Sequence, residues 1–220
     1  MVVHAGHRPP IHSPAPAAGG THAVAGRTVV VGLGRTGLSC ARYLQARGRA
    51  FAVTDSRVEP PGAEALARLA PHVETRFGGF DEGLLDGATQ IVVSPGVSLC
   101  EPFMRAAAAR GVPLVGDIEL FAREARAPVV AVTGTNGKST VTTLLAEMAR
   151  AAGQRVLAGG NLGRPALELL EEPAPDLYVL ELSSFQLETT QSLAVAAAAV
   201  LNVTADHMDR YASLAEYAAA

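Results

Sequence analysis

The chain has 220 residues, of which 49% are hydrophobic and 18% are charged, and its formal net charge at pH 7 is -3. This composition is typical of a globular protein with one large or two small domains, and the slightly acidic balance argues against a general nucleic-acid binder. Its two cysteines, Cys40 and Cys100, lack the spacing of a zinc site or a disulfide framework, so we expect a reducing, cytoplasmic location.

The composition of residues 1–26 predicts a disordered leader. They are rich in Pro, Gly, Ala and His, and their histidines are irregularly spaced. They contain no continuous apolar segment of the kind found in secretory signals. No apolar run in the whole chain reaches the ~18 residues that would indicate a membrane span.

The segment 27–115 begins with a nucleotide-binding pattern. A β-branched run at 27–31 predicts a strand, and Gly32, Gly34 and Gly37 follow it in the spacing G-x-G-x-x-G before a helical pattern. A second predicted strand, 50–54, ends in Asp55. This arrangement is typical of a dinucleotide site, with the pyrophosphate at the helix N-terminus and Asp55 on a ribose. The alternative is that the glycines serve only close packing of strand and helix.

The rest of this segment continues the alternation of strands and helices. Helices are predicted at 64–70 and 102–110, and an apolar strand is predicted at 90–93, before the turn Ser94-Pro95-Gly96. Open α/β sheets bind ligands at the carboxyl ends of their strands. We therefore predict a Rossmann-like α/β domain over residues 27–115.

The segment 116–220 contains the strongest motif of the chain. After a predicted helix at 117–125, the sequence PVVAVTGTNGKSTVTTLL (128–145) reads as a buried strand, a glycine turn and a helix that begins at Lys138. Backbone N–H groups, a lysine and a hydroxyl at a helix N-terminus are suited to hold a triphosphate with Mg²⁺. One departure is that the usual pattern has a glycine where this chain has Val132. An ordinary strand–turn–helix connection is the alternative. The predicted triphosphate site comprises Gly134, Thr135, Asn136, Gly137, Lys138, Ser139 and Thr140.

Polar residues follow the later strands of the same segment. A predicted strand at 155–158 leads to Asn161, and another at 177–180 ends in Glu181. An acid at the end of a strand beside a phosphate loop commonly holds Mg²⁺, although Glu181 could also be an exposed strand end. A helical pattern is predicted over 187–193. Asn161 is equally compatible with a ligand contact and with a turn.

The last predicted strand, 196–201, leads into the polar segment NVTADHMDRY. His207 in this segment is a candidate general base or Mg²⁺ ligand. A single histidine is more often structural. Lys138, Glu181 and His207 nevertheless all follow the carboxyl ends of predicted strands, so we expect them to converge on one catalytic site.

Four long motifs resemble the Mur ligase family of peptidoglycan synthesis. They are GTNGKSTVTTL (134–144), GGNLG (159–163), ELSSFQLE (181–188) and LNVTADHMDRY (201–211). The resemblance extends from about residue 27 to residue 217. Together with GDIELF (116–121), the last two motifs are most similar to the member that adds D-glutamate to UDP-N-acetylmuramoyl-L-alanine.

The resemblance implies a substrate for each half of the chain. The first domain (27–115) would hold UDP rather than NAD, with Gly34, Arg35 and Thr36 along the pyrophosphate. Asp55, Ser56 and Arg57 would lie near the uracil. The second domain (116–220) would be an incomplete phosphate-loop ATPase domain, in which Asn161, Ser183 and His207 line the muramoyl end.

The resemblance also implies the reaction, which is ATP-dependent amide formation through an acyl phosphate. Lys138, Glu181 and His207 would be catalytic, with Ser139 and Glu181 on one Mg²⁺ and His207 on a second. The family has a lysine just beyond the last residue of this sequence, and then a third domain. We therefore expect a monomeric fragment, not inserted in a membrane, that makes no product alone. The remaining alternatives are an NAD-dependent oxidoreductase and a non-catalytic nucleotide-binding module.

Overall fold

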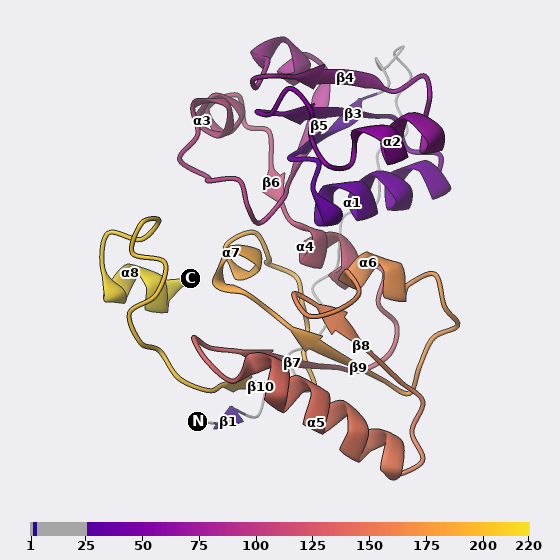
Figure 1. The fold of residues 1–220 in the computed structure, drawn as a ribbon, viewed down its shortest axis with the longest axis vertical. Helices are drawn as coiled ribbons and strands as arrows, with labels where there is room; N and C mark the ends of the chain where they lie inside the picture. Colours follow the sequence, from indigo (N-terminus) through magenta and orange to yellow (C-terminus); the bar gives the residue numbers. More distant parts are fainter. Residues whose placement is uncertain (1, 4–25) are drawn as a thin grey trace, which may run out of the picture.

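The computed structural model describes residues 2–3 and 26–220, so most of the predicted leader (1–26) lies outside the described residues. Two α/β units lie one above the other in Figure 1, each built on its own sheet. The strand β6 (Leu114–Val115) and the helix α4 (Asp117–Ala122) lead from the first unit to the second. None of the described helices has the length and hydrophobicity needed to span a bilayer.

The first unit contains a five-stranded sheet in the order β4-β3-β2-β5-β6, and all its neighbouring strands are parallel. Its central strand β2 has three consecutive fully buried valines, 29–31, as expected for a strand covered on both faces. The strand order and the helical connections confirm the prediction of a Rossmann-like α/β fold. The elements are β2 (Arg27–Val31), α1 (Arg35–Ala46), β3 (Phe51–Asp55), α2 (Ala63–Leu69), β4 (Glu74–Phe77), η1 (Glu82–Leu85), β5 (Ala88–Val93), α3 (Pro102–Ala109) and β6.

The second unit contains a sheet in the order β1-β10-β7-β9-β8, parallel except for β1, which pairs antiparallel with β10. The long helix α5 follows the central strand β7 and packs on β8 and β9. The elements are β1 (Val2–Val3), β7 (Val129–Thr133), α5 (Lys138–Ala151), β8 (Val156–Gly160), α6 (Ala166–Leu169), β9 (Leu177–Glu181), α7 (Ser184–Leu187), β10 (Ala197–Val200) and α8 (Leu214–Ala219).

A single hydrophobic cluster joins the two units. It includes Leu44 of α1, Leu120 and Phe121 of α4, and Tyr178 of β9. The rings of Phe121 and Tyr178 meet edge to face with their centroids 5.0 Å apart. Because such close-packed contacts are lost when either side moves, this cluster fixes the position of the second unit against the first.

The predicted helix over 187–193 is wrong. The helix α7 begins earlier, because Ser183 and Gln186 form a capping box at its N-terminus. It also ends earlier, because the hydroxyl of Thr190 donates to the carbonyl of Gln186 over 2.7 Å. The next backbone N–H groups donate to the carboxylate of Glu119 instead of continuing the helix. The sequence patterns also gave no indication of the short elements β4, η1, β6, α6 and α8.

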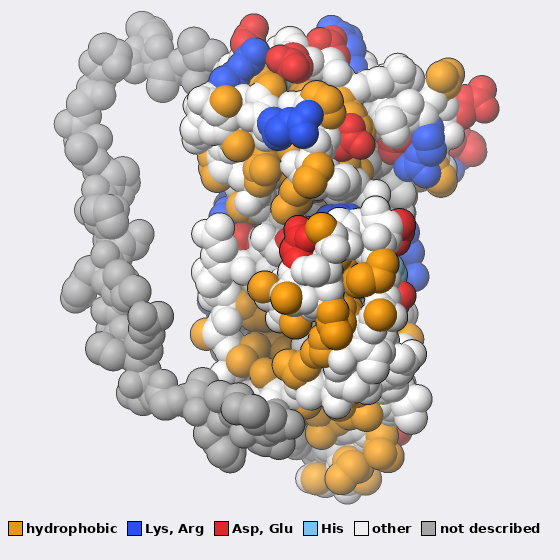
Figure 2. Space-filling model, turned by 90° about the vertical axis from the view of Figure 1, so that its left-hand side faces the viewer, with side chains coloured by type: hydrophobic (Ala, Val, Ile, Leu, Met, Phe, Trp, Pro, Cys, Tyr) orange, Lys and Arg blue, Asp and Glu red, His pale blue; other side chains and the backbone are white. Residues whose placement is uncertain are grey.

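Hydrophobic side chains gather over the second unit on the face shown in Figure 2. Among the described residues, six of the seven exposed large hydrophobic side chains belong to this unit. The second unit therefore leaves more large apolar side chains in water than the first. The six residues are Leu144, Met148, Val200, Val203, Met208 and Leu214.

Candidate functional site

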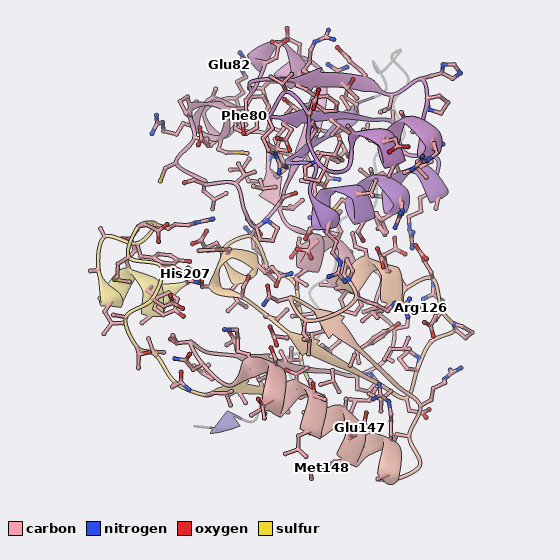
Figure 3. All side chains as sticks on the ribbon, viewed as in Figure 1. Phe80, Glu82, Arg126, Glu147, Met148 and His207 are labelled. Carbon is pink, nitrogen blue, oxygen red and sulfur yellow. The ribbon has the colours of Figure 1, made fainter. Side chains whose placement is uncertain are left out.

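A cleft of about 480 Å³ lies between the two units. The carboxyl ends of β2, β3 and β5 reach it from the first sheet, and the end of β8 reaches it from the second. The carboxyl edge is where parallel α/β sheets bind ligands. Phe80, labelled in Figure 3, belongs to its wall in the first unit. The lining residues are Gly32, Gly34, Arg35, Thr36, Asp55, Ser56, Arg57, Phe80, Ser94, Pro95, Gly96, Val97, Gly160, Asn161, Pro165 and Gln186.

The glycines of the turn at 32–37 have different roles. Gly37 serves packing, because a Cβ there would lie 1.8 Å from the carbonyl oxygen of Gly32. Gly34 is the N-cap of α1, and a Cβ there would meet nothing within 4 Å. No side chain caps α1 and its first turn carries no acid, so its first N–H groups are available to an anion. The packing interpretation of this motif is therefore confirmed at Gly37, whereas the ligand interpretation stays a prediction for the open N-terminus of α1 at Gly34.

Asp55 is buried and fully hydrogen-bonded from within the protein. One carboxylate oxygen accepts from the backbone N–H of Leu33 (2.6 Å) and from Nη2 of Arg57 (2.7 Å). The other accepts from the backbone N–H and from Nε of Arg57. Burial pushes the pKa of Asp55 upward, but the hydrogen bonds from Arg57 and Leu33 outweigh it and lower the pKa to about 2. All four acceptor positions are filled, so Asp55 acts on the cleft by holding Arg57 and the glycine turn.

Asn161 and Glu181 form a polar pair at the ends of β8 and β9. The side-chain amide of Asn161 donates to Oε1 of Glu181 over 2.6 Å, and the two residues are also joined through their backbones. Gly160 permits this approach, because a Cβ there would lie 2.4 Å from the carbonyl oxygen of Glu181. Glu181 is 2% exposed, and its Oε2 has no hydrogen-bond partner among the described residues. One buried carboxylate oxygen is thus left for a ligand or cation.

The loop at 134–137 has the predicted strand–turn–helix geometry. Gly134 (φ +132°) and Gly137 (φ +85°) adopt positive φ values that favour glycine, and Gly137 is the N-cap of the 14-residue helix α5. Val132, where the usual motif has glycine, is a core residue of β7. The ammonium group of Lys138 donates to the carbonyl oxygens of Gly134 (2.7 Å) and Thr135 (2.9 Å). The Lys138 side chain therefore stabilises its own loop by donating hydrogen bonds to two of the loop carbonyls.

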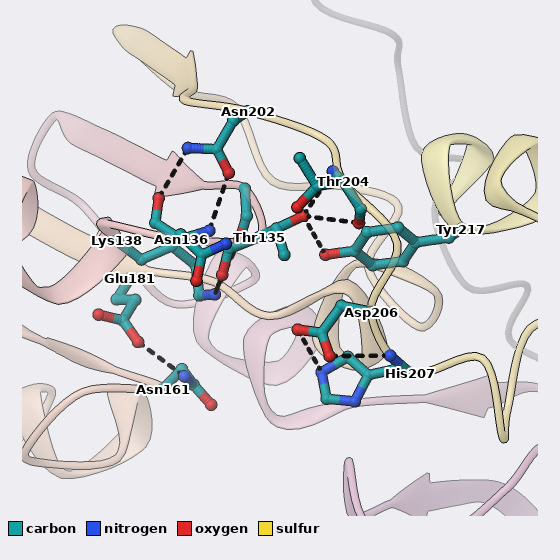
Figure 4. A network of polar contacts seen from close by, with 11 residues as sticks. Thr135, Asn136, Lys138, Asn161, Glu181, Asn202, Thr204, Asp206, His207 and Tyr217 are labelled. Atoms are coloured by element: carbon teal, nitrogen blue, oxygen red, sulfur yellow. Dashed lines mark hydrogen bonds and ion pairs between the residues drawn. The ribbon is translucent and has the colours of Figure 1, made fainter.

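Asn202 and Thr204 hold the same loop from the end of β10, as Figure 4 shows. The Asn202 amide accepts from the backbone N–H of Asn136 and donates to its carbonyl, both over 2.9 Å. The Thr135 hydroxyl accepts from the backbone N–H of Thr204 and donates to its carbonyl. It also lies 3.1 Å from the hydroxyl of Tyr217 in α8. A hydroxyl accepts two hydrogen bonds and donates one, so Thr135 is saturated when Tyr217 donates to it.

His207 lies on a constrained turn beside these residues. Its φ of +54° is the one positive value among described non-glycine residues. Its Nε2 lies 3.7 Å from Oδ2 of Asp206, and its ring centroid lies 4.7 Å from that of Phe185. Within residues 2–3 and 26–220, no three His, Cys, Asp or Glu side chains form a group suited to hold a metal. Glu181 and His207 therefore do not belong to a preassembled three-ligand centre of that kind.

Each of the two units matches a model of a known protein family. A family model described as the Mur ligase MurD-like N-terminal domain matches residues 26–116, and one described as the Mur ligase middle domain matches residues 132–220. The chain belongs to the Mur ligase family. The Rossmann-like unit is thus the part similar to the N-terminal domain, and the unit with the 134–137 loop is the part similar to the middle domain.

Curated Mur ligases resemble the chain at high identity. The chain is 62% identical over 194 residues to UDP-N-acetylmuramoylalanine–D-glutamate ligase of Nitrosococcus oceani, covering 88% of this chain and 43% of that protein. It is 61% identical to the protein of the same name from Marinobacter nauticus, covering 84% and 41% of the two chains. The chain therefore spans about two fifths of the length of these relatives.

Solved Mur ligase structures share the fold. The UDP-N-acetylmuramate–alanine ligase MurC of Thermotoga maritima matches with a TM-score of 0.52 and 21% identity, over 88% of this chain and 45% of that one. The UDP-N-acetylmuramate:L-alanyl-γ-D-glutamyl-meso-diaminopimelate ligase of Neisseria meningitidis matches with a TM-score of 0.54 and 20% identity, over 87% and 65%. At these identities the likeness concerns the fold alone.

The structure collects most of the predicted substrate residues of this Mur ligase in the cleft. Seven of them line it, whereas Ser183 and His207 do not. Ser183 instead caps α7, and the Gln186 side chain of the same box lines the cleft. Gln186 and Ser94 were not among the predicted site residues, although the Ser-x-x-Gln spacing and the turn after 90–93 were signals for them. Nothing in the sequence distinguished Phe80. The seven are Gly34, Arg35, Thr36, Asp55, Ser56, Arg57 and Asn161.

Proposed function

We propose that this chain contains the UDP-substrate site and the ATP site of a UDP-N-acetylmuramoylalanine–D-glutamate ligase of peptidoglycan-precursor synthesis. Support comes from relatives of that name at 61–62% identity. The single structural observation that carries the proposal is the cleft, which joins the glycine turn of the N-terminal domain to Asn161 of the middle domain. We assign residues 27–115 to the UDP-binding domain and residues 116–220 to the ATP-binding domain.

The UDP end of the substrate would occupy the N-terminal domain. The first N–H groups of α1, including those of Arg35 and Thr36, face the pyrophosphate, and the positive end of the helix favours this charge. Arg57, held by Asp55, lies with Ser56 near the uracil. Each oxygen of the Asp55 carboxylate already accepts two hydrogen bonds, so Asp55 is unsuited to accept another from a ribose hydroxyl. This disfavours the alternative of an NAD-dependent oxidoreductase.

The residues of the middle domain fit a triphosphate with Mg²⁺. The loop 134–140 offers backbone N–H groups, the Lys138 ammonium and the exposed hydroxyls of Ser139 and Thr140. Glu181 offers a buried oxygen without a partner in the described chain. Mg²⁺ is usually bound through one or two carboxylates together with substrate phosphates, so a preassembled carboxylate cluster is not required. When bound, the cation offsets negative charge on the reacting phosphoryl group.

In the proposed reaction, the terminal carboxylate of UDP-N-acetylmuramoyl-L-alanine attacks the γ-phosphorus of ATP, and ADP leaves. The amine of D-glutamate then attacks the carbonyl carbon of this acyl phosphate, phosphate leaves and an amide forms. Lys138 gives up its hydrogen bonds to the loop carbonyls and donates to the γ-phosphate instead. Asn161 orients Glu181, and His207 would be the residue that holds a second cation at the muramoyl end.

We also propose a cytoplasmic, monomeric enzyme. The structure describes Cys40 and Cys100 as free thiols, which is compatible with a reducing compartment.

Calorimetric titrations test this function. We expect the 220-residue chain to bind UDP-N-acetylmuramoyl-L-alanine in competition with UDP, and not to bind NAD. Lys138→Ala should leave this binding unchanged but abolish the rise in melting temperature produced by ATP with Mg²⁺. Binding of NAD in place of UDP would support the oxidoreductase. Full biological activity of a full-length Lys138→Ala protein would support the non-catalytic module.

A further inference from the structure

Arg210 joins the His207 turn to the wall of the cleft. Its Nη1 donates to the carbonyl oxygen of Pro95 over 2.8 Å, and its Nη2 donates to Oε2 of Glu188 over 2.8 Å. The guanidinium carbon lies 3.9 Å from the ring centroid of Phe185. The side chain is only 14% exposed and that of Glu188 only 16%, so these contacts are weakly screened by solvent.

The partners of Arg210 come from both domains. Pro95 follows β5 of the N-terminal domain and lines the cleft, whereas Phe185 lies in α7 of the middle domain and Glu188 directly follows that helix. Other contacts between the domains include the hydrogen bond from the Tyr43 hydroxyl in α1 to Glu124, which follows α4, and the one from Arg42 of α1 to Glu168 of α6. The Arg210 contact differs from these, because it ties the segment 201–211 directly to a residue that lines the cleft.

Arg210 also contacts the turn that carries His207. Both side chains pack on the ring of Phe185, and the backbone N–H of Arg210 donates to the carbonyl oxygen of His207 over 2.9 Å. The positive φ of His207 makes this turn unfavourable by itself. Contacts on both sides of the turn are therefore needed to keep it in place.

We propose that Arg210 is a positioning residue for the reaction. It fixes His207 relative to the cleft wall at Pro95, so that a substrate held at the 32–37 turn meets His207 at a set distance. This role rests on the proposed function. It requires the planar guanidinium, which donates in two directions while stacking on a ring, and a lysine cannot do both.

The free chain provides the first test, by NMR of the histidine rings. The Phe185 ring current should shift the His207 ring signals, which a His207→Gln spectrum would identify. We expect Arg210→Ala to move these signals toward the values of an exposed histidine, and Arg210→Lys to restore them only in part. Arg110→Ala is the matched control, since Arg110 pairs with Glu82 and Asp86 on the surface. Unchanged His207 signals in Arg210→Ala would overturn the proposal.

Binding provides the second test and separates positioning from general damage. We expect Arg210→Ala to leave the affinity for UDP within about twofold and to weaken UDP-N-acetylmuramoyl-L-alanine roughly 10-fold, as for one lost charge-assisted hydrogen bond. Equal weakening of both ligands would mean a merely structural role and overturn the proposal. If the unmodified chain bound neither ligand, the proposed function would fail, and the NMR result would still decide whether Arg210 positions His207.

Discussion

Two buried aspartates, Asp55 and Asp117, have pKa values shifted in opposite directions. Asp55 is surrounded by donors that lower its pKa to about 2 despite its burial. For Asp117, burial raises the pKa to about 6 against the effect of the amide of Gln186, which donates to Oδ2 over 2.9 Å. Its Oδ1 has no partner among the described residues. Hydrogen bonds thus offset the cost of burying the charged carboxylate of Asp55, whereas they do not offset it for Asp117.

These shifts predict opposite effects on stability. A folded pKa of about 2 against 3.8 means that Asp55 contributes about 2 kcal/mol above pH 4, which is lost as the pH falls through 2. A folded pKa of about 6 means that Asp117 costs about 3 kcal/mol above pH 6, and that this cost disappears between pH 6 and 4. We expect Asp55→Asn to destabilise at pH 7 and Asp117→Asn to stabilise by roughly 1–2 kcal/mol, less than the full cost because a buried amide also needs partners.

Urea denaturation from pH 3 to 8 measures both variants, and each is the control for the other. The free energy of unfolding of Asp55→Asn should fall less steeply with acid than that of the unmodified chain. Asp117→Asn should differ from the unmodified chain at pH 7.5 and converge with it near pH 4. Parallel pH profiles for all three proteins would contradict this assignment.

At the residue scale, the sequence predicted where Asp55 lies but not what its oxygens contact. Its place at the end of the predicted strand 50–54 was sufficient to put it on the cleft edge. The hydrogen bond to Leu33 depends on how the neighbouring loop closes, which no local pattern specifies. His207 was likewise located after the last strand, but its packing on Phe185 joins residues 22 positions apart. Such contacts depend on tertiary packing and could not be predicted.

At the scale of elements, the loop at 134–137 depends on the segment after β10 for its shape. Asn202→Ala removes both side-chain bonds to Asn136. We expect it to weaken binding of ATP with Mg²⁺ by about 1–2 kcal/mol, or roughly 5–30-fold, because the freed loop must be ordered by the ligand. Calorimetry with a non-hydrolysable ATP analogue measures this change.

Asn202→Asp is the matched control for this loop. It keeps the oxygen that accepts from Asn136 but loses the donor and adds a negative charge near the phosphates. It should therefore bind the analogue more weakly than Asn202→Ala does. Added salt should reduce this difference in affinity between the two variants. Equal affinities for both variants and the unmodified chain would show that Asn202 does not shape the loop.

Elements were predictable where the sequence carries their own start and stop signals. The helix α5 begins at Lys138 as predicted, because two glycines define its start. The start of α7 was missed although its Ser-x-x-Gln capping box is a local signal, and its end was misplaced because Glu119, which lies in another helix, takes the N–H groups of residues 191 and 192. The short strands β4 and β6 form through pairing with distant neighbours, so their own residues carry little signal.

At the scale of the whole molecule, the hydrophobic cluster around α4 contains residues of both domains. A second cluster, which includes Phe103 and Met104, is confined to the N-terminal domain. If the shared cluster couples the domains, damage in the second cluster must also destabilise the middle domain. The two domains would then unfold as one cooperative unit.

Met104→Ala tests this coupling. Met104 is fully buried, so its truncation should cost about 2–5 kcal/mol. Three of the four tyrosines, at 178, 211 and 217, lie in the middle domain, and a Tyr43→Phe background removes the fourth. In that background we expect Met104→Ala to lower the urea midpoint of tyrosine fluorescence as much as the midpoint of far-ultraviolet circular dichroism. A fluorescence midpoint that stays in place while the dichroism splits into two transitions would show that the domains fold independently.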